Sequence, residues 1–236
     1  MLSLLSRKYA HKIPFIVKLS HQQQLSYPQQ QGRASFGSVR EAWNLGAIGI
    51  AASIDFGSTQ TERQLTEIAH QFEIAHELGM FCVLNCHVTN DAFYKYERDY
   101  CLASDITSQA NHIGVAIQAD FIIQRMPNID KGFQTIGFCN STPQIDNQLL
   151  SEHPIDRCRY QLANCFGGKI PLLHSGGEPI GDKDLTESVK DAIVNKRAGG
   201  SGMMIGRRAI HRPFSEGVRF LQTIQDVYLS KEIGLA

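Results

Sequence analysis

The chain has 236 residues, of which 42% are hydrophobic and 19% charged, so it is long enough to bury a sizeable core and has the composition of a globular protein. Its 23 basic residues balance 23 acidic residues and give a formal net charge of +0. This balance argues against nucleic acid or an anionic membrane as the partner. It leaves a small molecule as the expected ligand.

Neither the N-terminal sequence nor the spacing of the cysteines indicates export or metal binding. Residues 1–8 place their charges after a short apolar run, the reverse of a secretory signal, and no stretch approaches the roughly 18 apolar residues of a membrane span. The six cysteines show no C-x-x-C spacing, and the histidines lack the i, i+4 pairing of a helical zinc site. We therefore expect a cytoplasmic protein with no disulfide framework, no metal and no cofactor.

Short apolar runs alternate with amphipathic stretches along the chain, as they do in repeated βα units. Strands are predicted at residues 15–19, 47–54, 81–86, 119–123, 170–174 and 202–205, all apolar enough to be covered on both faces of a parallel sheet. Helices are predicted at residues 38–45, 62–78, 105–117, 154–166, 184–197 and 214–228. Residues 127–152 lack such a pattern, and we interpret them as a long irregular insertion at a functional mouth.

Two α/β architectures accept repeated βα units, the open doubly wound sheet and the closed barrel. The open sheet would need a G-x-G-x-x-G fingerprint after its first strand, and this sequence has none there. Glycine-rich turns instead follow the last two strands, where barrels commonly bind phosphate. We therefore predict a single domain, residues 1–236, of the (β/α)₈ TIM-barrel type. Because Met1 stands close before the first predicted strand, we expect about six of the eight βα units, with two strands missing at the front.

The last two predicted strands run into sequences suited to an anion. One ends in Ser175-Gly176-Gly177 and the next in Gly206-Arg207, and we call these five residues the phosphate corner. Glycine backbone lets N–H groups approach an anion closely, the Ser175 hydroxyl can donate, and the Arg207 guanidinium matches phosphate oxygens. Either motif alone is equally well explained as a tight turn. Their place at consecutive strand ends favours a phosphate site.

Several separated stretches of the sequence resemble one family, in the same order along the chain. They include Arg7–Phe15, Phe72–Met80, Gln109–His112, Asn164–Cys165, Asn195–Gly200 and Gln225–Leu229. The family is that of the archaeal-type class I fructose-bisphosphate aldolases, particularly their bacterial branch. The resemblance implies a barrel that cleaves fructose 1,6-bisphosphate reversibly into dihydroxyacetone phosphate and glyceraldehyde 3-phosphate. It also implies catalysis without metal, through a lysine amine that forms a Schiff base with the ketone.

Positions that carry the chemistry of that family are changed in this chain. The family's Schiff-base lysine follows Ala-Asp and two apolar residues, and the matching position here is Ile123, which has no nucleophile. Arg125 cannot replace the lysine, because a guanidinium stays protonated. The family's Trp-x-Tyr is matched by Asn85 and His87, and its tyrosine before Phe-Gly-Ser is matched by Asp55. We therefore expect no catalytic site to be intact.

Three functions are compatible with these changes. The first is an aldolase-family chain that has lost its chemistry, as a gene remnant or decayed paralogue. The second is a non-catalytic protein that binds a phosphorylated sugar or a related subunit through the phosphate corner. The third is a different enzyme that uses His87 with Asp55 for proton transfer.

Two further expectations concern a lysine and the assembly. Lys18 stands at a strand end where the family also has lysine, and we interpret it as a substrate contact, with a relocated Schiff base as the alternative. Missing strands would leave open sheet edges, so we expect a homo-oligomer or an aggregation-prone product.

Overall fold

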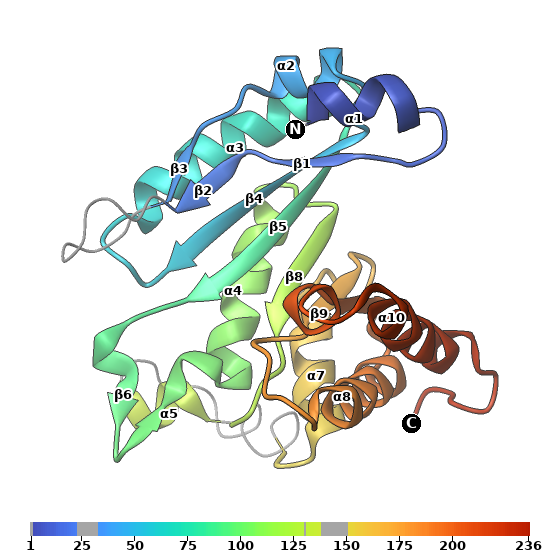
Figure 1. Cartoon of the computed structure of the whole chain (residues 1–236). Coiled ribbons are helices and arrows are strands. Elements are labelled where there is room, and N and C mark those ends of the chain that lie inside the picture. Colours follow the sequence, from blue (N-terminus) through green and yellow to red (C-terminus); the bar gives the residue numbers. More distant parts are fainter. Residues whose placement is uncertain (1, 23–32, 130, 138–150) are drawn as a thin grey trace. The chain divides into compact units, whose positions relative to one another are not determined.

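A computed structural model describes residues 2–22, 33–129, 131–137 and 151–236. Within them, six strands form one sheet in the order β1-β4-β5-β8-β9-β10, which is also their order along the chain (Figure 1). The strands are β1 (Ile16–Lys18), β4 (Gly49–Phe56), β5 (Phe81–Val88), β8 (Phe121–Arg125), β9 (Leu172–Ser175) and β10 (Gly202–Met204). β1 with β4, β4 with β5, and β9 with β10 pair in parallel. The bounds of each of the six strands lie within about two residues of the predicted ones, because long apolar runs mark buried parallel strands clearly.

Six helices lie close to the predicted ranges. They are α2 (Val39–Asn44), α3 (Thr61–Glu77), α4 (Ser104–Ala116), α7 (Pro154–Ala163), α8 (Asp184–Ala198) and α10 (Phe214–Leu229). Pro154 occupies the first turn of α7, where its missing N–H leaves no intrahelical bond unmade. Gly79, at φ +72°, follows the end of α3 and lets the chain turn into β5.

The shorter elements were not predicted. They are α1 (Leu2–Tyr9), β2 (Ser20–Gln22), β3 (Arg33–Ser35), β6 (Tyr94–Lys95), β7 (Arg98–Asp99), α5 (Gly132–Ile136), α9 (Arg207–Ile210) and the 3₁₀ turns η1 (Asp91–Phe93) and η2 (Tyr100–Leu102).

The expectation of an irregular stretch at 127–152 is wrong where α5 lies. The Asp105 carboxylate accepts the Gly132 and Phe133 N–H groups at 2.9 Å each and fixes the start of this helix from a distant element. Such a tertiary signal is absent from the local sequence. Residues 130 and 138–150 of that expectation lie outside the described residues.

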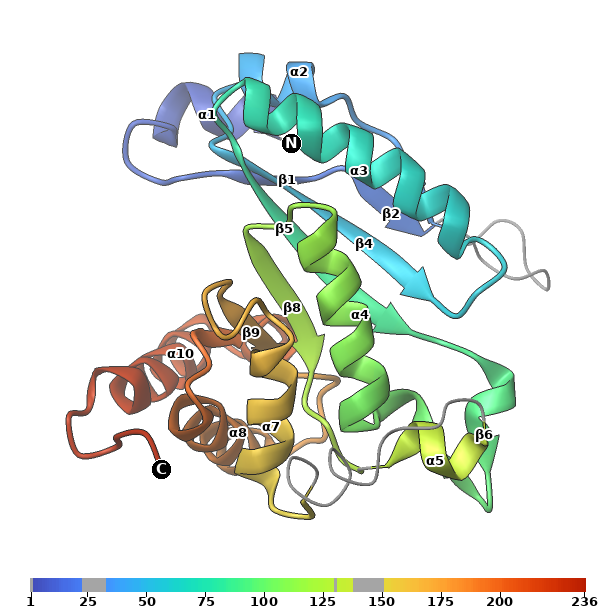
Figure 2. The same ribbon diagram turned by 180° about the vertical axis from the view of Figure 1, so that it is seen from behind.

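The chain groups into two compact units, and residues 1–90 with 113–122 make the first. Here α3 packs against β4 and β5 (Figure 2), and its Phe72 is fully buried, as are Ile50, Ile54 and Leu84 of the two strands. Gly114 of α4 belongs to this core. A Cβ there would lie 2.8 Å from both Leu84 and Ile122, so the helix reaches its contact distance to the sheet only with glycine.

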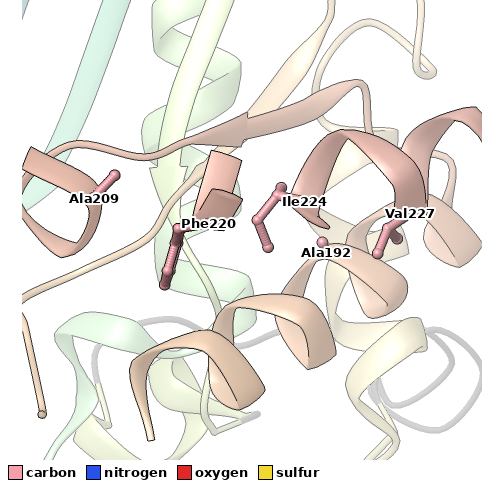
Figure 3. Packing of buried hydrophobic residues seen from close by; sticks show 5 residues of the cluster. All are labelled: Ala192, Ala209, Phe220, Ile224 and Val227. Atoms are coloured by element: carbon pink, nitrogen blue, oxygen red, sulfur yellow. The ribbon is translucent and has the colours of Figure 1, made fainter. Parts of the chain in front are cut away.

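Residues 91–112 and 123–236 make the second unit. One apolar cluster of this unit joins α8, α9 and α10, and its buried members are drawn in Figure 3: Ala192, Ala209, Phe220, Ile224 and Val227. α7 packs on α8 as well. These helices hold β9 and β10, and with them the strand ends that carry the phosphate corner.

Candidate functional site

The phosphate corner begins where β9 and β10 end side by side. Ser175 is in register with Met204, and the Gly176 N–H donates to the Met204 carbonyl at 3.0 Å. This pairing brings Ser175-Gly176-Gly177 next to the segment that leads into Gly206 and Arg207. The juxtaposition that the sequence predicted is therefore present in the second unit.

Two of the glycines have a structural reason of their own. A Cβ on Gly176 would lie 2.8 Å from the Ile205 side chain, and Gly177 has φ +71°, which side-chain-bearing residues rarely adopt. The Gly176 amide is already used by Met204 and is not offered to a ligand. A tight turn thus accounts for these glycines as well as an anion does, so phosphate binding stays a prediction.

Arg207 already has an anionic partner within the chain. Its guanidinium lies 2.5 Å from the Glu178 carboxylate, with the two side chains 58% and 66% exposed. Glu178 directly follows Ser175-Gly176-Gly177, so this carboxylate belongs to the same corner. An anion that uses Arg207 must compete with it.

Arg208 is a residue that the sequence analysis missed. Its side chain is buried, and it donates to the Glu178 carbonyl at 3.0 Å and to the Ser188 hydroxyl at 2.9 Å. The Asp184 carboxylate lies 3.4 Å from Arg208 and 2.9 Å from Arg212. Arg208 therefore fastens the loop after β9 to α8, and the tandem arginine pair in the sequence was the signal available for it.

A buried hydrogen-bond network lies directly behind Ser175. His174 is fully buried, and its Nε2 and Nδ1 lie 2.8 Å from Gln161 Oε1 and 2.7 Å from Asn195 Nδ2. The Asn195 amide can only donate to Nδ1, so Nε2 carries the proton and donates to Gln161. Asn195 Oδ1 in turn accepts the Tyr228 hydroxyl at 2.7 Å. Burial lowers the pKa of His174 to about 3, which keeps the ring neutral.

His174 was also missed, although a polar residue inside an apolar strand directly before Ser-Gly-Gly was a signal for it. Its side chain points to α7 and α8, where Gln161 and Asn195 lie. Successive strand residues alternate, so Ser175 points to the opposite face. The network thus fixes the strand whose end carries the corner.

Ile123, the position that the resemblance assigns to the Schiff-base lysine, is in the middle of β8 and 7% exposed. The next residue, Gln124, bonds Asn111 of α4 at 3.0 Å, so Ile123 points to the face of the strand that α4 does not cover. An inward-facing, nearly buried position suits a lysine with a lowered pKa. An isoleucine there offers no nucleophile.

Asn85 and His87 lie on β5 in the first unit. In register they oppose Ser53 and Asp55 of β4, and residues in register on parallel neighbours share a face. However, Arg33 Nε donates to both oxygens of the Asp55 carboxylate, at 2.9 Å each. The pairing of Asp55 with His87 that a proton-transfer enzyme would need competes with this ion pair.

Lys18 ends β1 and is in register with Ala51 of β4. Burial lowers its pKa, the positive charge of Arg33 lowers it further, and the Asp55 carboxylate offsets part of the shift. A lowered pKa increases the fraction of free amine at neutral pH. The lowered pKa of Lys18 is therefore compatible with a relocated Schiff base as well as with a substrate contact.

Comparison with known proteins identifies the family of this chain and its fold. The chain belongs to the DeoC/LacD aldolase family, whose model matches residues 1–212. The α/β barrel fold and the resemblance to class I fructose-bisphosphate aldolases are thereby confirmed.

Particular relatives are more specific. The chain is 45% identical over 236 residues to a probable fructose-bisphosphate aldolase class 1 of Chlamydia trachomatis and 44% identical to that of Chlamydia muridarum, covering 100% of this chain and 68% of each relative. It also resembles an archaeal fructose-1,6-bisphosphate aldolase solved with its catalytic lysine bound to the carbinolamine intermediate, at 18% identity and a TM-score of 0.73, covering 97% of this chain and 76% of the other. Among the described residues, no helix is long and apolar enough to cross a membrane.

Proposed function

We propose that this aldolase-family chain binds the phosphorylated sugars of the class I fructose-bisphosphate aldolase reaction through its phosphate corner, without Schiff-base chemistry at position 123. The adjacent ends of β9 and β10, with Ser175 and Arg207, are the observation that supports binding. Isoleucine at the family's lysine position supports the loss of catalysis. The reading of residues 1–236 as one barrel domain, its cytoplasmic location and its self-association stay predictions.

Calorimetric titration with fructose 1,6-bisphosphate tests the binding. We expect Arg207→Ala to weaken the affinity at least about tenfold, since a charged hydrogen bond to phosphate contributes about 1.5–3 kcal/mol. Arg219→Ala is the matched control, because it removes the same charge from the exposed face of α10. Absence of heat, or equal affinities for the two variants, would contradict the proposal.

Glu178 offers a second test of the same corner. Replacing Glu178 by Gln frees the Arg207 guanidinium and removes a negative charge that repels phosphate. Measured exposed ion pairs typically contribute about 0.2–1 kcal/mol, and the removed repulsion adds to this, so the affinity for fructose 1,6-bisphosphate should rise about two- to fivefold. The titration is repeated with Glu187→Gln, a change of the same charge on α8. An unchanged or lower affinity in Glu178→Gln would show that Arg207 does not contact the phosphate.

Lys18 defines the catalytic alternative. The lowered pKa of its amine favours it as the site of a relocated Schiff base, and trapping with borohydride distinguishes the two functions, as described in the Discussion.

A further inference from the structure

Three side chains capable of binding a metal converge in the first unit, at the end of β5 opposite to Asn85 and His87. His76 is in the last turn of α3, Cys82 is the second residue of β5, and Asp120 directly precedes β8. One ligand atom from each lies within 4.8 Å of the others, and His76 Nε2 is 3.0 Å from Asp120 Oδ2.

Backbone hydrogen bonds fix this arrangement. The Cys82 N–H donates to Asp120 Oδ2 at 2.7 Å, and the Asp120 N–H donates to the Cys82 carbonyl at 2.9 Å. The Met80 N–H bonds the Ala75 carbonyl at 2.9 Å and ties the start of β5 to the end of α3, where His76 lies. The three side chains therefore meet because of the fold, and not through the reach of flexible surface chains.

A hydrogen-bonded tie between His76 and Asp120 accounts for two of the three residues. The Cys82 sulfur takes no part in this tie: it is buried in the core, and its Sγ makes only a weak thiol hydrogen bond to the Phe72 carbonyl, at 3.8 Å. An imidazole nitrogen, a thiolate and a carboxylate are together a ligand set that zinc prefers. The thiolate and the carboxylate would also balance the two charges of the cation.

We infer that His76, Cys82 and Asp120 bind a thiophilic divalent cation such as Zn²⁺, with water as the fourth ligand. Bonds of about 2.0–2.3 Å at tetrahedral angles place two ligand atoms about 3.3–3.6 Å apart, so the Cys82 sulfur must move toward the other two ligand atoms by up to about 1 Å, while His76 and Asp120 are already close enough. The His76 and Asp120 side chains are 30% and 42% exposed, so a cation can enter, while Cys82 is buried. The site would fasten α3 to the starts of β5 and β8, away from the strand ends of the candidate active face.

Binding of a metal at this site requires the Cys82 thiol to lose its proton. Burial and the negative charge of Asp120 raise the pKa of the Cys82 thiol to about 12, so the metal must displace a proton. Metal binding at this site therefore releases the thiol proton.

Cobalt titration of the chelator-treated full chain tests the inference, because Co²⁺ reports its ligands by absorption. One equivalent should bind and give a near-ultraviolet band of sulfur-to-cobalt charge transfer. Cys82→Ser should abolish this band, whereas Cys86→Ser, which changes another buried cysteine of the same strand, should keep it. His76→Gln preserves a donor to Asp120 and removes the imidazole, so it should weaken binding of Zn²⁺ at least about tenfold.

The inference is overturned if the wild-type chain gives no charge-transfer band, or if the band persists in Cys82→Ser. If Cys82→Ser does not fold, His76→Gln decides: an unchanged affinity for Zn²⁺ rejects the site. None of these outcomes depends on the phosphate corner.

Discussion

Protein incubated with dihydroxyacetone phosphate and then reduced with borohydride is expected to keep its unmodified mass. A Schiff base needs an unprotonated amine beside the bound ketone, and the position that carries this amine in the family is Ile123. Arg125, on the same strand, cannot form a stable imine. Intact-mass spectrometry before and after reduction measures the result.

Ile123→Lys is the matched gain-of-function variant. Ile123 is 7% exposed, and burial would lower the pKa of an introduced amine and favour its reaction with the ketone. We expect an adduct that peptide mapping places at position 123. We do not expect cleavage of fructose 1,6-bisphosphate, because Asn85 and His87 still stand where the family has its Trp-x-Tyr.

An adduct on the wild-type chain would contradict the loss of Schiff-base chemistry. Peptide mapping would then identify the lysine, and Lys18→Met would show whether the chemistry has moved to Lys18. Loss of the adduct in that variant would establish a relocated Schiff base, and the chain would then count among the catalytic members of its family.

Elements whose signal is local were predictable from the sequence. The apolar run of β4 and the helical periodicity of α3 need no partner to be recognised. Elements set by distant partners were not. The start of α5 depends on the Asp105 carboxylate, and β2 and β3 pair across residues 23–32, which lie outside the described part of the chain.

The candidate site divides in the same way. The phosphate corner was predictable, because serine, glycine and arginine at strand ends are marked in the sequence itself. The Glu178 contact with Arg207 was not, since an exposed glutamate in a loop indicates no partner. Nor could the sequence reveal that Arg33 occupies the carboxylate of Asp55, because the two residues are brought together only by the fold.

The free energy of unfolding should fall by about 2 kcal/mol between pH 7 and pH 5 through His174 alone. The folded protein holds this histidine neutral, because burial lowers its pKa from 6.5 to about 3. The unfolded chain takes up the proton at the ordinary pKa of 6.5. Above that pH both states are neutral and His174 causes no pH dependence. As the pH falls below 6.5, only the unfolded state gains the proton, so stability declines until the pH reaches about 3.

Urea denaturation followed by circular dichroism at pH 7, 6 and 5 measures this decline. His174→Gln is the informative variant, because its amide can still donate to Gln161 and it does not titrate. It should be less stable than the wild type at pH 7, since the flexible Gln side chain replaces a rigid ring that meets Gln161 and Asn195 at the same time, but its stability should depend less on pH by the same 2 kcal/mol or so.

Two carboxyl groups, the buried Asp105 and the half-buried Asp191, act in the opposite direction, so the wild type must be compared with the variant. Burial raises the pKa of Asp105 and of Asp191, so each takes up a proton in the folded state before it does so in the unfolded state. Below their folded pKa values these carboxyl groups oppose the loss caused by His174. The wild type and His174→Gln share both groups, so the difference between their pH profiles isolates the histidine. Parallel profiles would mean that His174 takes up a proton in the folded chain, and the neutral hydrogen-bonded ring behind Ser175 would have to be abandoned.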